Sequence, residues 1–416
     1  MKLSTRLRLQ ALAVWTARIL TGFTFIVSGW AKAIDPWGFI IKVGEYLTVW
    51  GMNVPEEAII TGCSTLAIIE FATGVMIATG CLRRVAVWCA AAMMTFMLPL
   101  TLYIWIASPV SDCGCFGDFI KISNAATFAK NIVISALVVY LLFRNRTLRG
   151  IYVPAMQWLV IVASLAFPLY LAFMGYQVQP LVDFRPYKTG TPVFTDVSRT
   201  DEPDMFLYER NGITKEFPLD QLPDSTWTYV GDATATDAGL GGDIEIRDAD
   251  GYDCAADFYE STGPVLLLIV PEPDVHYLSF AHYVNRLYAA SQRENIGFAA
   301  VLGAEGAELK RWADWCRPSF DVYTADPTSL KQLVRGKEAL VYIYNGEIIW
   351  KRTLGSLSTV MPGEMTKEAL DNLAVPDSGT WHAIALGLYV AFLVLVYLLS
   401  LSPAIVRFFV SLLRKI

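Results

Sequence analysis

The sequence predicts an α-helical integral membrane bundle joined to a soluble α/β domain, and three observations lead to this fold class. Apolar residues make up 54% of the 416 residues, more than an ordinary soluble protein carries. Six apolar stretches have about the length that crosses a hydrocarbon core, roughly 20 residues. Residues 175–381 hold 17 Lys+Arg and 32 Asp+Glu, whereas the rest of the chain holds 16 and 7. An acidic block attached to a basic membrane block indicates two domains and argues against nucleic acid as a partner.

Basic residues between the apolar stretches predict the topology. The predicted spans are residues 11–31, 57–80, 85–107, 125–143, 152–174 and 383–406. If the chain zigzags, four Lys/Arg clusters fall on one side: before the first span, between the second and third, between the fourth and fifth, and after the sixth. By the positive-inside rule that side is the cytoplasm. Both termini are then cytoplasmic, and residues 108–124 and 175–381 are extracytoplasmic.

The first span also allows a second interpretation, because "AKA" at residues 31–33 resembles a signal-peptide cleavage site. Its apolar region is too long for that, and Arg18 lies inside it, so we expect an uncleaved membrane helix. The predicted parts of the chain are a four-helix membrane domain (1–150), a fifth transmembrane helix (151–174), an extracytoplasmic connector (175–240), an α/β domain (241–381), and a sixth transmembrane helix with a basic cytoplasmic tail (382–416).

The loop "SPVSDCGCFGDFIKIS" (residues 108–123) places Cys113 and Cys115 around one glycine. A disulfide across one residue closes a small ring, and a strained, exposed disulfide is easily reduced and exchange-active. Neighbouring Asp112 and Asp118 oppose a thiolate by like charge, whereas the start of the following helix favours it. Three interpretations stay open from these residues: a redox pair, a structural disulfide, and a site for copper(I), which soft thiolates select.

Two ionisable residues fall inside predicted spans, Arg18 in the first and Glu70 in the second. Charges within a membrane are costly and usually face a partner, so we expect these two to pair with each other. Glu70 is also a candidate for handling protons or contacting a quinone headgroup; the alternative is an ion pair that only fixes helix packing. We expect Lys32, at the outer rim, to extend its ammonium toward water.

Three strings together resemble a known family. "RILTGFTFIVSGWAKAIDPWGF" (18–39), "EFATGVMIATG" (70–80) and the C-x-C-F-G motif in "DCGCFGD" (112–118) are similar to the DoxX-like and MauE-like membrane family. The resemblance covers about residues 10–145 and implies a four-helix bundle linked to disulfide formation in an exported partner. Its architecture resembles quinone-coupled disulfide-generating enzymes of the vitamin K epoxide reductase type. Such enzymes relay electrons between two cysteine pairs, and this bundle lacks a second outward pair.

The soluble part has the predicted element order βαβαβαββα over about residues 242–375, which resembles the thioredoxin fold. Asn345-Gly346 predicts the closing hairpin, and Asn211-Gly212 predicts another in the connector. The stretch "PEPDVHYL", after the first buried strand, has no C-x-x-C, so the dithiol of a redox-active member is absent.

Four further residues of this domain are of types that often take part in catalysis or metal binding, but the sequence predicts an ordinary structural or surface role for each. Cys254 and Cys316 are expected to form a structural disulfide or to stay as lone thiols. His276 and His282 are six residues apart on one predicted helix, not the i,i+4 pair of a metal site, so we expect surface or packing residues.

Two functions follow as hypotheses. The first is a membrane thiol-disulfide oxidoreductase of the bacterial inner membrane that uses Cys113 and Cys115 to support disulfide formation in an exported protein with thiols. Electrons would pass to a membrane quinone or to a second protein; no cofactor is certain from the sequence. The second is a non-catalytic membrane scaffold whose thioredoxin-like domain binds an exported protein, with the cysteine pair as a structural disulfide. Membrane lipid surrounds the chain in both.

Overall fold

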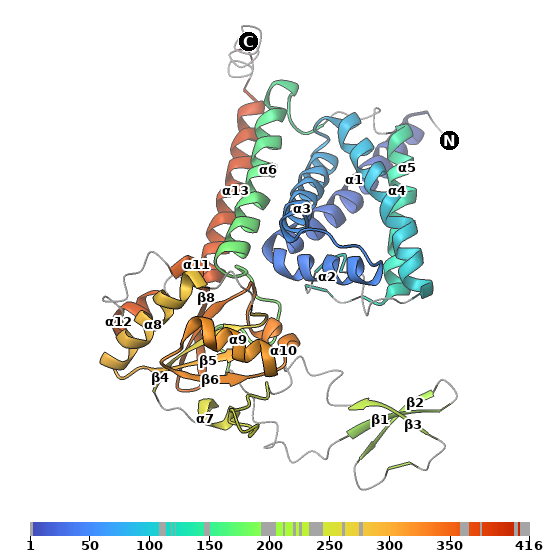
Figure 1. The fold of residues 1–416 in the computed structure, drawn as a ribbon. Helices are drawn as coiled ribbons and strands as arrows, with labels where there is room; N and C mark the ends of the chain where they lie inside the picture. The colour runs from blue at the N-terminus through green and yellow to red at the C-terminus, as the bar shows by residue number, and fades with distance from the viewer. Residues whose placement is uncertain are drawn as a thin grey trace. The chain divides into compact units, whose positions relative to one another are not determined.

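The computed structural model describes residues 3–107, 114–117, 119–120, 122–144, 150–192, 205–210, 213–218, 222–223, 227–232, 244–259, 263–273, 278–357, 366–374, 377–402 and 407. Cys113, Asp112, Asp118, the Asn211-Gly212 turn and His276 lie outside these residues. The chain forms two compact units. The first is Met1–Phe184 with Pro376–Ile416, and the second is Arg185–Val375 (Figure 1).

All regular secondary structure in the described part of the first unit is helical. Its helices are α1 (Leu3–Ile34), α2 (Pro36–Val49), α3 (Glu56–Thr79), α4 (Arg83–Ala107), α5 (Asn124–Arg144), the short η2 (Pro154–Met156), α6 (Gln157–Gln177) and α13 (Ser378–Ser400). Among the described residues, six helices are long and apolar enough to cross a membrane, which confirms the six predicted spans. Large apolar side chains such as Trp88, Ile106 and Phe143 are exposed on this unit, as a lipid-facing surface requires.

Helix α2 was not predicted, although the residues at its start are typical of a helix N-terminus. Asp35 is the N-cap, and its side chain accepts a hydrogen bond from the backbone N–H of Gly38 at 2.9 Å. Pro36 occupies the first helical position, where a missing N–H costs nothing. Trp37, Phe39 and Ile40 are buried in a small apolar cluster with Cys63.

Glycines let α1 and α3 approach each other closely. A Cβ atom added at Gly29 would lie 2.4 Å from the backbone N of Phe71, and one at Gly74 would lie 2.6 Å from the N of Ile26. No side chain larger than hydrogen fits at such distances. This close crossing brings the end of α1 against the middle of α3, and so positions the candidate site.

The loops of the first unit gather at two ends. At one end, the N–H of Ile151 donates to the carbonyl of Thr79 at 2.8 Å, and Ser400 Oγ lies 3.4 Å from Met156 Sδ. At the other end, Trp30 contacts both Phe184 and His382. This grouping is the one that a zigzag of the six helices requires.

The second unit contains two sheets. Its elements are β1 (Met205–Arg210), β2 (Ile213–Pro218), β3 (Thr228–Asp232), α7 (Ala255–Tyr259), β4 (Pro264–Val270), α8 (Leu278–Arg293), β5 (Gly297–Leu302), α9 (Gly306–Cys316), β6 (Asp321–Thr324), α10 (Pro327–Leu333), β7 (Ala339–Tyr344), β8 (Glu347–Thr353), α11 (Leu354–Leu357) and α12 (Lys367–Asn372). The five-stranded sheet has the order β6-β5-β4-β7-β8; β4, β5 and β6 are parallel, and β7 and β8 antiparallel. From β4 to α12 the predicted order βαβαβαββα is present, with α11 added.

Side chains of β4 alternate between two cores, one on each face of the sheet. Leu266 and Leu268 belong to one core, and Leu267 and Ile269 to the other. The predicted hairpin at Asn345-Gly346 is confirmed: both residues have positive φ, 50° and 77°, as a type I′ turn requires. His282 is exposed on α8, as predicted.

The predicted connector (175–240) is not one segment. Residues up to Phe184 belong to the first unit, whereas Tyr187 is buried in the α/β core, and the N–H of Gly190 donates to the carbonyl of Ile348 at 2.7 Å. Later in the connector, β1 pairs antiparallel with β2 and β3. Arg210 lies opposite Ile213, the register that a two-residue hairpin gives.

Candidate functional site

The loop that carries Cys115 makes a tight turn. Gly114 and Gly117 have positive φ values of 65° and 55°, and the N–H of Gly117 donates to the carbonyl of Gly114 at 3.0 Å. Side chains with a Cβ rarely adopt this backbone region, so the glycines of C-G-C-F-G are needed for the turn. Phe116 is buried, and the ammonium of Lys130 on α5 lies 4.3 Å from its ring centre.

A chain of three polar contacts joins this loop to α1 and α3. Ser28 Oγ donates to the carbonyl of Cys115 at 2.6 Å. Lys32 Nζ donates to Ser28 Oγ at 3.2 Å and pairs with Glu70 Oε2 at 2.7 Å. Ser28 and Lys32 are one turn apart on α1, so both face α3 and the loop.

A cavity of about 40 Å³ lies between these groups. It has room for about two or three water molecules. Its polar lining is Thr24, Ser28, Lys32, Glu70, Cys115, Lys130 and Asn131. Three methionines of α4 also line it: Met93, Met94 and Met97. Thioethers are soft ligands. Two ammonium groups against one carboxylate leave an excess positive charge, however, and this disfavours a metal cation such as copper(I).

The expected pairing of Arg18 with Glu70 is wrong. Glu70 pairs with Lys32. Arg18 is fully buried near Gly80, where α3 ends, and its guanidinium lies 5.1 Å from the Trp15 ring centre. Gly80 follows Glu70 by ten residues, about 15 Å along a helix, which places the two charges at different depths.

Lys32 also departs from its prediction, because only 1% of its side chain is exposed. Its ammonium turns inward to Glu70 instead of outward to water. The family-like pattern of the first span contained this residue, but only the crossing of α1 and α3 shows what it pairs with. Ser28, Lys130 and Asn131 were not predicted as site residues.

Of the two alternatives expected for Cys254 and Cys316, the structure has the lone thiols: neither cysteine is part of a disulfide. Cys316 belongs to the core on one face of the five-stranded sheet, whereas Cys254 precedes Ala255, which belongs to the core on the other face. A sheet therefore separates the two sulfurs, and no disulfide can span it.

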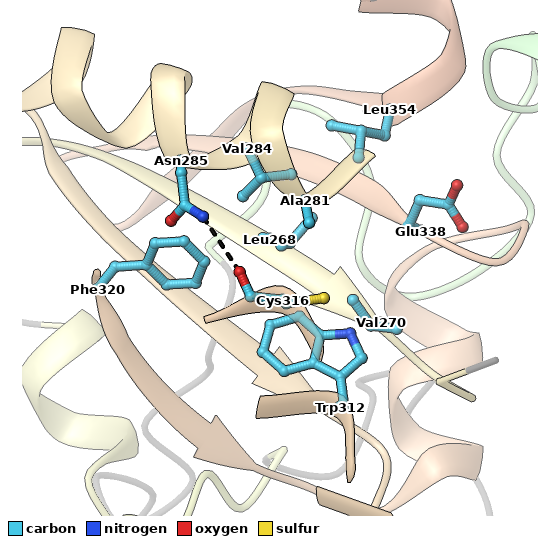
Figure 2. Close-up of a pocket in the computed structure, with 10 residues that line it drawn as sticks. All are labelled: Leu268, Val270, Ala281, Val284, Asn285, Trp312, Cys316, Phe320, Glu338 and Leu354. Carbon is cyan, nitrogen blue, oxygen red and sulfur yellow. Dashed lines mark hydrogen bonds between the residues drawn. The ribbon is translucent and has the colours of Figure 1, made fainter. Parts of the chain in front are cut away.

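The two thiols also have different neighbours. Figure 2 shows Cys316 beside Trp312 in a small apolar cavity, with Asn285 Nδ2 donating to its carbonyl at 3.2 Å. Burial raises the pKa of the Cys316 thiol. The pKa of Cys254 is also raised, by desolvation first and then by the carboxylates of Asp248 and Asp257.

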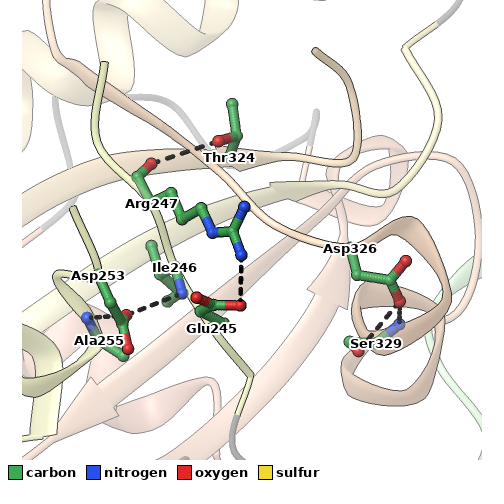
Figure 3. Close-up of polar contacts among 8 residues, drawn as sticks. All are labelled: Glu245, Ile246, Arg247, Asp253, Ala255, Thr324, Asp326 and Ser329. Carbon is green, nitrogen blue, oxygen red and sulfur yellow. Dashed lines mark hydrogen bonds and ion pairs between the residues drawn. The ribbon is translucent and has the colours of Figure 1, made fainter. Parts of the chain in front are cut away.

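The α/β unit has a larger polar cavity, of about 540 Å³, beyond the carboxyl ends of β5 and β6. Arg247 pairs with Glu245 at 2.8 Å, and its carbonyl accepts from Thr324 (Figure 3). Asp326 accepts from the N–H of Ser329 at 2.8 Å. Glu305 and Glu308 add two more carboxylates to the lining, so the cavity is acidic. None of the described residues that line it is a cysteine.

Together the apolar helices and the loop define an integral membrane protein with a cysteine-bearing turn packed on its first helix. Comparison with known proteins narrows this class. Residues 10–144 match the family model described as methylamine utilisation protein MauE, a region that contains most of α1, all of α2, α3, α4 and α5, and the C-G-C-F-G loop. The MauE part of the family resemblance is thereby confirmed over those residues.

The other comparisons cover shorter or different parts. Residues 205–235 match a domain of unknown function (DUF8463). Protein TlpB of Flavobacterium psychrophilum is 29% identical over 132 residues, which are 31% of this chain and 36% of that protein. The chain thus spans about a third of the length of this curated relative. No solved structure matches the chain. The DoxX-like and thioredoxin-like resemblances stay predictions.

Proposed function

We propose that this protein is a membrane thiol-disulfide oxidoreductase that supports disulfide formation in an exported protein through Cys113 and Cys115. The observation that carries the proposal is the position of Cys115: its carbonyl is held by Ser28 beside a cavity with a buried ion pair. Ionisable groups inside a membrane protein usually mark a functional site. The MauE match over the same residues and the similarity to TlpB support it.

The proposed reaction is thiol-disulfide exchange. A thiolate of the exported protein attacks the Cys113–Cys115 disulfide, which forms a mixed disulfide and releases the other cysteine as a thiol. A second thiol of the partner then displaces the membrane cysteine. The partner gains a disulfide, and the pair gains two electrons and two protons as two thiols.

Turnover requires an acceptor for these two electrons. A membrane quinone would take both, with two protons, and become a quinol as the disulfide re-forms; a second disulfide protein would serve equally. The α/β unit, which has no C-x-x-C, would bind the partner instead of reacting with it. Both termini would be cytoplasmic and residues 175–381 extracytoplasmic, because the four basic clusters lie on one side of the zigzag.

The test is to trap the mixed disulfide. Full-length Cys113→Ser and Cys115→Ser variants are expressed in the native cell, and covalent partners are identified by mass spectrometry after acid quenching. We expect one single variant to accumulate an exported protein, and the double variant to accumulate none. Cys254→Ser is the matched control. If neither single variant traps a partner and the cell phenotype is intact, the scaffold hypothesis, with a structural disulfide, replaces this one.

The proposed topology has its own test. Tyr252 is 73% exposed in the α/β unit, so Tyr252→Cys provides a thiol that a reagent can reach. A membrane-impermeant maleimide added to intact spheroplasts should label it without lysis. Labelling only after lysis would place this unit in the cytoplasm.

A further inference from the structure

We propose that Ser28 and Lys32 are positioning residues for Cys115, with Lys32 supplying a buried positive charge that favours the Cys115 thiolate. This inference deepens the thiol-exchange function proposed above and rests on it. The juxtaposition that carries it is the contact chain from Glu70 through Lys32 and Ser28 to the Cys115 carbonyl.

The direction of these hydrogen bonds follows from proton counting. Lys32 is an ammonium and only donates, so Ser28 Oγ accepts from it at 3.2 Å. The single hydroxyl proton of Ser28 is then available to the Cys115 carbonyl, 2.6 Å away. Lys32 orients Ser28, and Ser28 holds the backbone of Cys115. The loop is thus fixed to α1 at the residue that bears the sulfur.

Helix packing does not explain the buried pair. α1 and α3 already meet through Gly29 and Gly74, at distances that admit no Cβ. An apolar pair of similar volume would pack there without the cost of desolvating two charges, and is often as stable or more so. The positively charged member of the pair also faces the loop, because Lys32, and not Glu70, donates to the serine that holds Cys115.

Other charged side chains also lie near the loop. Lys130 of α5 and Glu70 of α3 line the same cavity. Lys42 of α2 runs along Gly114 but pairs with Glu45 at 3.1 Å on a more exposed side of the loop. Only 1% of the Lys32 side chain is exposed, against 19% for Lys42. Water therefore screens the charge of Lys32 less than that of Lys42.

The experiment measures how the alkylation rate of Cys115 depends on pH. Full-length reduced protein in detergent is treated with iodoacetamide, and the Cys115 peptide is quantified by mass spectrometry. Removing an opposite charge near an ionising group typically moves its midpoint by about one pH unit or more. We expect Lys32→Met to raise the midpoint by about one unit, and Lys32→Arg, which keeps the charge, to change it little.

Two further variants separate positioning from charge. Ser28→Ala should speed hydrogen exchange of the 114–117 amides and raise the midpoint by less than Lys32→Met does. Lys42→Met is the matched control, and we expect a shift of at most a few tenths of a unit because its charge is screened. A wild-type profile in Lys32→Met overturns the proposal, as does an equal shift in Lys42→Met.

A second variant separates an effect on folding from an effect on the Cys115 thiol. If Lys32→Met leaves too little folded protein, the Lys32→Met/Glu70→Gln double variant removes both charges and should fold. The double variant is then judged by the same pH profile. Alkylation needs no partner protein. A shifted profile without any trapped partner would therefore overturn only the exchange function, and a trapped partner with an unshifted profile would overturn only this inference.

Discussion

Cys115 of the membrane unit and the two cysteines of the α/β unit lie in different electrostatic surroundings. Cys115 lines a cavity with two ammonium groups and one carboxylate, whereas Cys254 lies near Asp248 and Asp257, and Cys316 lies among apolar side chains. The pKa values of Cys254 and Cys316 are raised. Only a thiolate is nucleophilic, so both α/β thiols are held in their unreactive form at neutral pH. The surroundings of each sulfur, more than the element order around it, separate a candidate reactive cysteine from a packing one.

Removing single sulfurs tests this contrast most strongly. Cys115→Ser should abolish exchange, whereas Cys316→Ala should leave it unchanged, because only the first sulfur takes part in the proposed reaction. The measurement is the rate at which native membrane vesicles oxidise a reduced, unfolded ribonuclease. Cys254→Ala is the control for the second thiol of the α/β unit. Comparable losses of oxidation rate in Cys316→Ala and Cys115→Ser would indicate that a cysteine of the α/β unit takes part in the exchange reaction.

The two units also contain ion pairs of different kinds. Lys32–Glu70 is buried in the membrane unit, whereas Lys331 and Glu272 of the α/β unit pair with 31% and 70% of their side chains exposed. Glu70→Gln leaves a buried ammonium without its carboxylate and should cost about 3–5 kcal/mol of unfolding free energy. Lys331→Met should cost about 0–1 kcal/mol.

The double variant Lys32→Met/Glu70→Gln sharpens that comparison. It removes both buried charges and should be within about 1 kcal/mol of the wild type or more stable. Unfolding in detergent, followed by circular dichroism, measures all of these variants. A double variant as unstable as Glu70→Gln alone would mean that the pair itself stabilises the bundle.

The close crossing of α1 and α3 gives the next prediction. In Gly29→Ala the new Cβ meets backbone atoms at 2.4–2.8 Å, which should cost about 1–3 kcal/mol and displace the Cys115 loop. Gly62 lies on α3 with open space around it, so Gly62→Ala should be neutral or stabilise by up to about 1 kcal/mol. Thermal unfolding in detergent measures both. Equal effects would show that the crossing has room to relax.

Much of the fold was predictable because it depends on local or periodic signals. Apolar length predicted the six spans, charge asymmetry predicted the two units, and Asn345-Gly346 predicted the hairpin, since a type I′ turn is encoded in two residues. The match to MauE likewise follows from strings that lie close together in the sequence.

The pairing of side chains was harder to predict, because it depends on how elements cross. Whether Glu70 meets Arg18 or Lys32 is decided by the depth at which α1 and α3 cross, and Gly29 sets that depth through contacts distant in sequence. The choice between a disulfide and lone thiols at Cys254 and Cys316 stayed open for a related reason: which face of a sheet a residue occupies depends on strand register, and a sheet lies between the two.

Thiol reactivity at neutral pH gives the smallest expected effect. In reduced wild-type protein at pH 7, iodoacetamide should modify Cys115 faster than Cys254 or Cys316, by about tenfold for each unit that separates their pKa values. Since a raised pKa lowers the thiolate fraction at neutral pH, the two α/β thiols should react faster as the pH rises toward those pKa values, and the gap should narrow. Peptide-level mass spectrometry measures all three rates in one sample. Unfolding in urea is the control: it removes the surroundings that distinguish the sulfurs, so the rates should converge. Rates at pH 7 that are already equal in the folded protein would contradict the electrostatic contrast between the two units.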